Sequence, residues 1–231
     1  MLKLPIYALT PFTLLDFPHR TACIVWFSGC NMRCGYCHNP DIVKGGKGKY
    51  TIEDTLTFLE KRKELLDGVV LSGGEATLYK DIVPFTQTVK DLGFAVKLDT
   101  NGTRPDIIRA LLDKKLLDYV ALDYKAPRSA FRKVTETDLF PPFDKTLTLL
   151  TQQDDVPFEV RTTVHSSMLG TDEIDDITAD LAQKGYRGAY YVQNYINNGD
   201  RVLGDLTAQK EQLDTESLDR PCDFTLAFRN F

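Results

Sequence analysis

The sequence predicts an α/β fold, a partial (β/α)6 barrel with parallel strands. Three observations lead to this prediction. Six short apolar runs rich in β-branched residues alternate with segments of helical periodicity, which is typical of a parallel sheet with crossover helices. Glycine-rich or charged residues follow the ends of several of these runs. The 231 residues, 42% of them hydrophobic, suffice for one large domain with a substantial core.

The expected elements follow one another in regular order along the chain. Strands are predicted over residues 21–27, 69–71, 94–98, 119–122, 158–164 and 190–193. Helices are predicted over residues 51–66, 79–92, 105–115, 144–152 and 171–184. Thr51 with Asp54 resembles a capping box, and Thr171 is the expected N-cap of the last helix.

The two ends of the chain fall outside this alternation. Residues 5–20 read as an irregular lead-in, whose Asp16-Phe17-Pro18 run could cover the base or open edge of the barrel. Residues 194–231 read as a C-terminal extension, helix-like over 206–218 and alternating like a strand over 224–228. It either packs across the open edge of the barrel or forms a partner surface. We therefore expect one domain over residues 1–231, with its core over about 21–193.

Composition excludes several classes of function. The net charge is −5 and the charged residues are mixed along the chain, which gives no basic stripe for nucleic acid. We expect no membrane partner, because there is no signal-peptide pattern and no apolar segment of about eighteen residues. The prediction is a soluble, cytoplasmic protein. An odd count of five cysteines argues against a disulfide framework and for a metal site.

The main candidate for that site is a loop directly after the first predicted strand, with thiols at Cys30, Cys34 and Cys37. Thiolates select zinc, copper(I) or iron–sulfur clusters. Electron-transfer clusters ordinarily use four cysteines, so a cubane held by three would leave one iron open to a small molecule.

Other ligand sets remain open at this point. His38 could complete a zinc site, although it directly follows Cys37 and is poorly placed for a tetrahedron. Cys23 or Cys222 could supply a fourth thiolate and make a plain electron carrier. Each of these two is more simply a lone thiol, and Cys23 lies within an apolar strand, as buried cysteines often do.

The spacing Cys30-x3-Cys34-x2-Cys37, with aromatic Tyr36 before the last cysteine, resembles the cluster motif of radical S-adenosylmethionine (SAM) enzymes. The wider pattern, including His38-Asn39-Pro40, resembles the glycyl-radical-enzyme activases. The resemblance covers residues 10–193 and is nearest to activators of anaerobic ribonucleoside-triphosphate reductase. Further motifs continue it in order: Asp16-Phe17-Pro18, Ser72-Gly73-Gly74-Glu75-Ala76, Asp99-Thr100-Asn101-Gly102 and Leu122-Asp123-Tyr124-Lys125.

The resemblance implies roles for the matching residues. The three cysteines would hold one 4Fe-4S cluster whose open iron chelates SAM, and Tyr36 would lie against the adenine. Gly73, Gly74 and Glu75 would meet the methionyl ammonium, where glycines allow a close approach of backbone carbonyls and Glu75 either supplies negative charge or fixes the loop. A plain turn at the end of a strand is the simpler alternative for the glycines.

Roles are also implied for polar residues at later strand ends. Asp99 and Asp123 match positions that hold a monovalent cation, and Asn101 follows Asp99 in the same motif; the aspartates could instead simply cap helices. Lys125 and Arg161 would bind the SAM carboxylate or ribose, or else be ordinary surface partners. Gln193, or its neighbour Asn194, would reach the adenosine or the substrate.

The implied reaction is reductive cleavage of SAM and formation of a glycyl radical on a partner enzyme, which we expect to be anaerobic ribonucleotide reductase. Reduced flavodoxin or ferredoxin would supply the electron. A single cluster is expected because residues 39–50 contain no cysteine. Two alternatives are a radical SAM enzyme acting on a small molecule, similar to 7-carboxy-7-deazaguanine synthase, and a non-enzymatic zinc or electron-transfer module.

Overall fold

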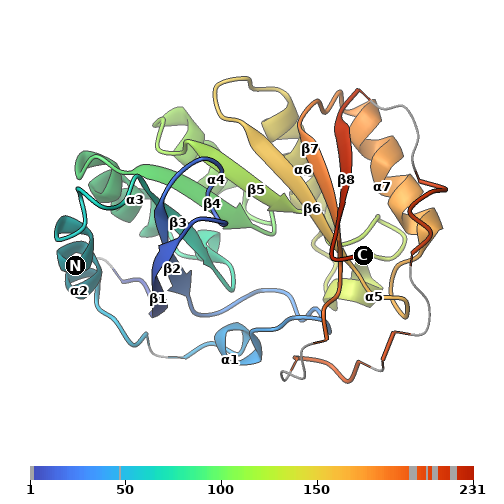
Figure 1. Cartoon of the computed structure of the whole chain (residues 1–231), viewed down its shortest axis with the longest axis horizontal. Coiled ribbons are helices and arrows are strands. Elements are labelled where there is room, and N and C mark those ends of the chain that lie inside the picture. Colours follow the sequence, from blue (N-terminus) through green and yellow to red (C-terminus); the bar gives the residue numbers. More distant parts are fainter. Residues whose placement is uncertain (1–2, 47, 198–201, 207, 210–212, 219–222) are drawn as a thin grey trace. The chain divides into compact units, whose positions relative to one another are not determined.

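The computed structural model describes residues 3–46, 48–197, 202–206, 208–209, 213–218 and 223–231 (Figure 1). The chain forms two compact units. The first comprises Met1–Asn31, Asp41–Thr100 and Arg104–Ala121, and the second comprises Met32–Pro40, Asn101–Thr103 and Leu122–Phe231. Strand β5 (Tyr119–Asp123) begins in the first unit and ends in the second. The single domain expected from the sequence stays a prediction.

Among its described residues, the first unit contains four complete strands paired in chain order, β1 (Ile6–Thr13), β2 (Ala22–Phe27), β3 (Gly68–Gly73) and β4 (Ala95–Thr100) (Figure 1). β2 pairs with β3, and β3 with β4, in parallel, as the sequence predicted. Five of the six residues of β2 are buried, which is why the strand reads as an unbroken apolar run.

Strand β1 corrects the prediction of an irregular lead-in over residues 5–20. It pairs antiparallel with β2, and its register is interrupted between Thr10 and Thr13, around Pro11. Proline has no backbone N–H to donate and is tolerated mainly on edge strands and at bulges. The interruption at Pro11 hid this strand from sequence reasoning.

The residues that follow β1 cover the starts of the parallel strands. Phe17 is buried in a cluster with Ala22, Val70 and Ala95. A Cβ atom at Gly68 would lie 2.7 Å from the Phe17 ring, so the first residue of β3 leaves room for it. The lead-in therefore has the structural role of covering the base of these strands.

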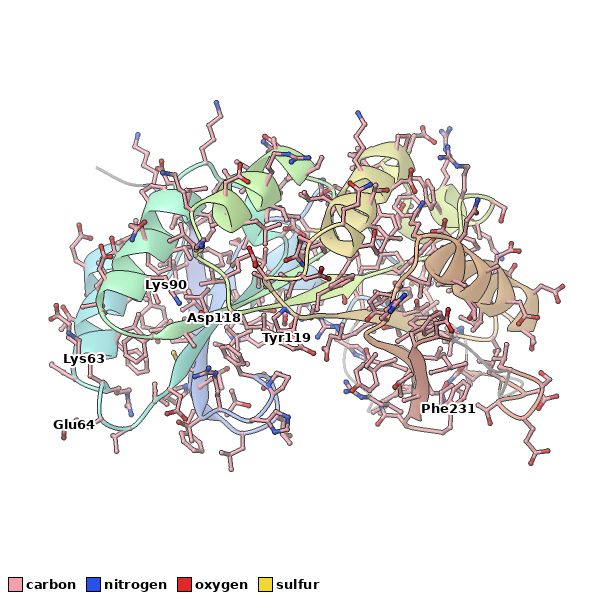
Figure 2. All side chains as sticks on the ribbon, turned by 90° about the horizontal axis from the view of Figure 1, so that it is seen from above. Lys63, Glu64, Lys90, Asp118, Tyr119 and Phe231 are labelled. Carbon is pink, nitrogen blue, oxygen red and sulfur yellow. The ribbon has the colours of Figure 1, made fainter. Side chains whose placement is uncertain are left out.

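The helices of the first unit are shorter than expected. They are α1 (Pro40–Val43), which starts in the other unit, α2 (Ile52–Glu60), the 3-10 helix η1 (Ala76–Leu78), α3 (Ile82–Asp91) and α4 (Pro105–Asp113). The capping box of Thr51 and Asp54 is confirmed. Figure 2 labels Lys90 and Asp118, whose 2.7 Å ion pair joins α3 to the residue before β5.

The second unit contains the end of β5 and the strands β6 (Phe158–Val164), β7 (Ala189–Asn194) and β8 (Thr225–Arg229). β6 pairs with β7, and β7 with β8, in parallel (Figure 1). The alternating pattern near the C-terminus is thus a strand along the edge of β7. The helix expected over 206–218 is wrong for the described residues of that range; residues 207 and 210–212 lie outside them.

Three helices lie wholly within the described part of the second unit: α5 (Phe131–Thr135), α6 (Phe140–Thr151) and α7 (Thr171–Gln183). α5 was not predicted. α6 begins earlier than expected, because Pro141 and Pro142 occupy its first turn, where no intrahelical N–H bond is needed. The N-cap of α7 is Gly170 and not Thr171, which is its first helical residue. No helix among the described residues is long and apolar enough to span a membrane.

Candidate functional site

In the first unit, the loops after β2 and β3 are in close contact. The N–H of Gly74 donates to the Phe27 carbonyl (2.8 Å) and the N–H of Glu75 to the Gly29 carbonyl (2.9 Å). A Cβ atom at Gly74 would overlap the carbonyl oxygen of Gly29. Glycine is therefore required at Gly74 for the loop that carries Cys30 to lie against the end of β3.

Glu75 supports this contact between the loops after β2 and β3 through its buried side chain. Its side chain is 1% exposed, and one carboxylate oxygen accepts hydrogen bonds from the N–H of Thr77 (3.1 Å) and the hydroxyl of Thr100 (2.9 Å). The carboxylate thereby joins η1 to the end of β4. The sequence left two roles open for Glu75, and these contacts support the role of fixing the loop.

Asp99, near the end of β4, lies beside a buried lysine. Lys97 Nζ is 2.7 Å from Asp99 Oδ1, and Ser72 donates its hydroxyl to Asp99 Oδ2 at 3.1 Å. The Lys97 side chain is only 3% exposed. A buried ammonium needs a paired carboxylate, so Asp99 serves as the counter-ion of Lys97. The alternative of a helix cap does not hold, because the N-cap of α4 is Arg104.

The backbone around Cys30 has its own supports. Tyr79 donates its hydroxyl to the Ser28 carbonyl (2.6 Å), and the N–H of Gly29 donates to Ile42 (2.7 Å). Burial, with a smaller contribution from Cys30, raises the pKa of Tyr79 above its ordinary value. Tyr79 thus stays a neutral donor next to the loop.

In the second unit, Cys34 and Cys37 lie on one tight turn, in which the N–H of Cys37 donates to the Cys34 carbonyl (3.0 Å). Tyr36 on this turn is buried, and its hydroxyl has no hydrogen-bond partner among the described residues. Burial raises the pKa of Tyr36 well above its ordinary value, so the phenol stays neutral. The Lys125 ammonium lies 5.9 Å from the centre of its ring.

An ionic network joins the end of β5 to the first half of β6 in this unit. The Asp123 carboxylate forms ion pairs with the Lys125 ammonium (3.0 Å) and the Arg161 guanidinium (3.0 Å). The guanidinium of Arg161 also lies 3.8 Å from the Glu159 carboxylate. Burial by itself would raise the pKa of Asp123, but Arg161 and Lys125 outweigh it and hold the pKa below its ordinary value. Burial likewise disfavours the Lys125 cation, yet Asp123 above all raises the pKa of Lys125 well above normal. The network is a preformed set of two cations and two carboxylates.

The two remaining predicted residues of the second unit lie on other elements. Asn101 is buried, and its amide oxygen accepts from the N–H (3.1 Å) and the hydroxyl (2.7 Å) of Thr103, which shapes the turn after β4. Gln193 lies on β7 between Thr163 of β6 and Arg229 of β8 in the pairing register. Neither placement assigns the residue a ligand.

The donor chemistry of the cysteine motif fits an iron–sulfur cluster. None of the four described cysteines is in a disulfide, and Cys222 lies outside the described residues. Burial raises the pKa of Cys23 to about 12, which agrees with a protonated core thiol and not a ligand. No three His, Cys, Asp or Glu side chains of the described part are gathered as a ready metal cage. The cluster assignment therefore rests on the thiols, their spacing and the family.

Sequence reasoning missed Lys97, Tyr79 and Glu159. A lysine inside the apolar run of β4 was a readable signal, because charged residues are almost never fully buried unless paired. Tyr79 and Glu159 gave no comparable signal, since an aromatic residue after a glycine-rich turn and an acid in a strand are both common.

Comparison with known proteins agrees with these observations. Residues 24–185 match the profile of the Radical SAM superfamily. A protein of Methanocaldococcus jannaschii, provisionally named a glycyl-radical enzyme activating enzyme, is 32% identical over 181 residues, covering 76% of this chain and 75% of the relative. The pyruvate formate-lyase-activating enzyme of Clostridium pasteurianum is 36% identical over 128 residues, 52% of each chain. The chain belongs to the radical SAM superfamily, within the group of glycyl-radical-enzyme activating enzymes.

Solved structures support the fold. SuiB of Streptococcus suis, bound to its precursor peptide SuiA, superposes with a TM-score of 0.70 at 15% identity over 89% of this chain. This chain spans about half of SuiB, 48% of its length. The predicted fold class, a parallel α/β fold of the radical SAM type, is confirmed. SAM and a 4Fe-4S cluster are the cofactors of this superfamily.

Proposed function

We propose that this protein activates a partner enzyme by generating a glycyl radical on it. The observation that carries the proposal is the similarity, over three quarters of the chain, to the archaeal relative named for this activity. The cysteine motif agrees with it, because none of its three cysteines is in a disulfide and a cluster held by three thiolates keeps one iron open to SAM.

Within the proposal, Cys30, Cys34 and Cys37 hold the cluster. Gly73 and Gly74 present backbone to the methionyl ammonium, and Glu75 keeps their loop in place through Thr77 and Thr100. Held by these three cysteines, the cluster would supply the electron for reductive cleavage of SAM, and SAM would supply the radical chemistry that removes a hydrogen atom from a glycine of the partner. The chain contributes binding, orientation and exclusion of water.

Polar residues of the second unit orient the rest of SAM in this proposal. Lys125 and Arg161 bind its carboxylate or ribose, and their ion pairs with Asp123 stabilise their charged forms. Buried Tyr36 offers a flat neutral surface to the adenine. Asn101 and Gln193 are assigned to the adenosine or the incoming substrate.

A monovalent cation near Asp99 and Asp123 is a finer part of the proposal, and the ion pairs of these residues weigh against it. Asp99 is paired with Lys97, and Asp123 with Lys125 and Arg161. A carboxylate that already has a cationic partner attracts a second cation less strongly. SAM cleavage that rises steeply with added potassium at constant ionic strength would support the cation.

The first prediction tests the cofactor site with two matched substitutions. Cys34→Ala should remove both the cluster and SAM cleavage, because three thiolates are needed to hold it. Cys23→Ala removes a buried thiol of the core and should leave both in place. The measurements are iron and sulfide content after anaerobic reconstitution, and 5′-deoxyadenosine formed with a chemical reductant. Retention of cluster and cleavage in Cys34→Ala would refute the site.

The partner requires a separate experiment. We propose anaerobic ribonucleotide reductase as the partner and reduced flavodoxin or ferredoxin as the donor, in an oxygen-poor cytoplasm. Purified anaerobic ribonucleotide reductase and pyruvate formate-lyase should be tested side by side, with the glycyl radical read by electron paramagnetic resonance. A radical on pyruvate formate-lyase alone would contradict anaerobic ribonucleotide reductase as the partner. SAM cleavage stimulated only by a small molecule, or a colourless zinc protein, would favour the alternative functions.

A further inference from the structure

The chain returns to the cysteine loop near its C-terminus, within the second unit. The N–H of Leu203 donates to the carbonyl of Cys37 (3.0 Å), and the N–H of Gly204 donates to the carbonyl of Gly35 (2.9 Å). The two glycines approach so closely that a Cβ atom at Gly204 would lie 2.8 Å from the Cα of Gly35. Residues 202–206, together with Gln209, are called the C-terminal strap below.

Gln209 anchors the strap to the ends of β6 and β7. Its amide nitrogen donates to the side-chain oxygen of Asn194 and to the carbonyl of Tyr195, both at 3.0 Å. Its amide oxygen accepts from the N–H of Ser166 at 3.3 Å. A side chain that satisfies three groups on two strand ends is a fixed attachment point, not a loose surface contact.

The same strand end also contacts the loop through side chains. The ring of Tyr195 stacks on His38 at 5.0 Å with an interplanar angle of 10°, and His165 meets it edge-on at 5.2 Å. The N–H of Tyr195 donates to the Val164 carbonyl at 2.9 Å, which fixes the tyrosine backbone. The turn that bears Cys34 and Cys37 is therefore held by backbone bonds from the strap, and the residue after it, His38, by stacking on Tyr195 directly after β7.

We propose that the C-terminal strap is a positioning element for the cluster, acting through the carbonyls of Gly35 and Cys37. Leu203 and Gly204 are positioning residues, since they contact the loop and not the thiols. Fixing the turn before the metal arrives lowers the ordering entropy that cluster binding must overcome. The inference rests on the proposed function for its meaning, but the contacts can be tested without it.

The test uses thiol alkylation of the full-length protein without cluster, followed residue by residue by mass spectrometry. Gly204→Ala should release the strap, and Cys37 should react at least about threefold faster, because alkylation reports local opening. Gly46→Ala is the matched control, since a Cβ atom there meets nothing within 4 Å. Gln209→Ala tests the anchor, with the exposed Gln87→Ala as its control. Circular dichroism verifies that each variant is folded.

The second readout is the reduced cluster of the reconstituted protein. Gly204→Ala and Gln209→Ala should change its electron paramagnetic resonance spectrum with SAM and speed its loss to a chelator, whereas the two controls should match wild type. Wild-type reactivity of Cys37 and a wild-type spectrum in both strap variants would overturn the proposal. If wild type binds no cluster, the proposed function fails, yet faster alkylation in the strap variants would still uphold the strap contacts.

Discussion

Gly74 and Gly46 illustrate how one residue type serves different purposes at the scale of single residues. A methyl group at Gly74 would overlap the carbonyl of Gly29, whereas one at Gly46 would enter open space. Gly74→Ala must shift the backbone next to Cys30, at a cost of about 3 kcal/mol. We expect a large loss of cluster content in Gly74→Ala and none in Gly46→Ala, measured as bound iron. Equal iron in both variants would contradict the contact.

Asp123 gives a pH-dependent prediction. Its pKa is lower in the folded protein than in the unfolded chain, so its stabilising contribution is complete above the unfolded value of about 3.9. The contribution is lost as the pH falls through the folded value. Asp123→Asn should therefore cost about 2 kcal/mol at pH 7, where Lys125 and Arg161 lose their partner.

The difference between wild type and Asp123→Asn should shrink below about pH 4. The measurement is urea unfolding of the protein without cluster across this range. Asp106→Asn provides a control at an exposed ion pair, which contributes little to stability. A difference that stays constant down to pH 3 would show that Asp123 does not titrate with folding.

At the scale of elements, a chain of hydroxyls joins three strands of the second unit. Tyr190 on β7 donates to the hydroxyl of Thr162 on β6 (3.0 Å), which donates to the Tyr124 carbonyl directly after β5 (2.7 Å). Tyr190→Phe should cost about 1 kcal/mol of unfolding free energy. Thr162→Val leaves two buried groups without their partner and should cost about 2–3 kcal/mol. Equal losses in the two variants would contradict the order of this chain.

The elements also show which signals a sequence carries. Thr51 and Asp54 form the predicted capping box because its contacts are local. β1 escaped prediction because its pairing with β2 is long-range and Pro11 breaks its pattern. α6 was placed too late because Pro141 and Pro142 look like breakers, although a first turn accepts them. Local contacts could be predicted from the sequence, whereas tertiary pairing could not.

The candidate site likewise has features that could be predicted from the sequence and features that required the structure. The cysteine spacing, the glycines after β3 and the polar strand ends could be found from sequence, because each is a short motif. Lys97 as partner of Asp99, and Glu159 as partner of Arg161, depend on distances that the sequence does not contain. Glu75 could be located, but its contacts with Thr77 and Thr100 required the structure.

For the whole molecule, the prediction of a single cluster can be tested by stoichiometry. Reconstituted wild type should bind about four iron and four sulfide per chain, as one cubane requires. Cys222→Ser should leave this count unchanged, because Cys222 is expected to be an unbound thiol. About eight irons per chain, or a loss in Cys222→Ser, would contradict a single cluster on these three cysteines.

The attachment of the cysteine loop to Leu203, Gly204 and Tyr195 has a consequence for the order of events during synthesis. The thiols are synthesised long before Tyr195, Leu203 and Gly204, the residues that hold their turn. A nascent chain stalled before residue 195 presents the cysteines on an unsupported loop. Residues as far as Gly204 must therefore be synthesised before the loop can be fixed in the form that the structure shows.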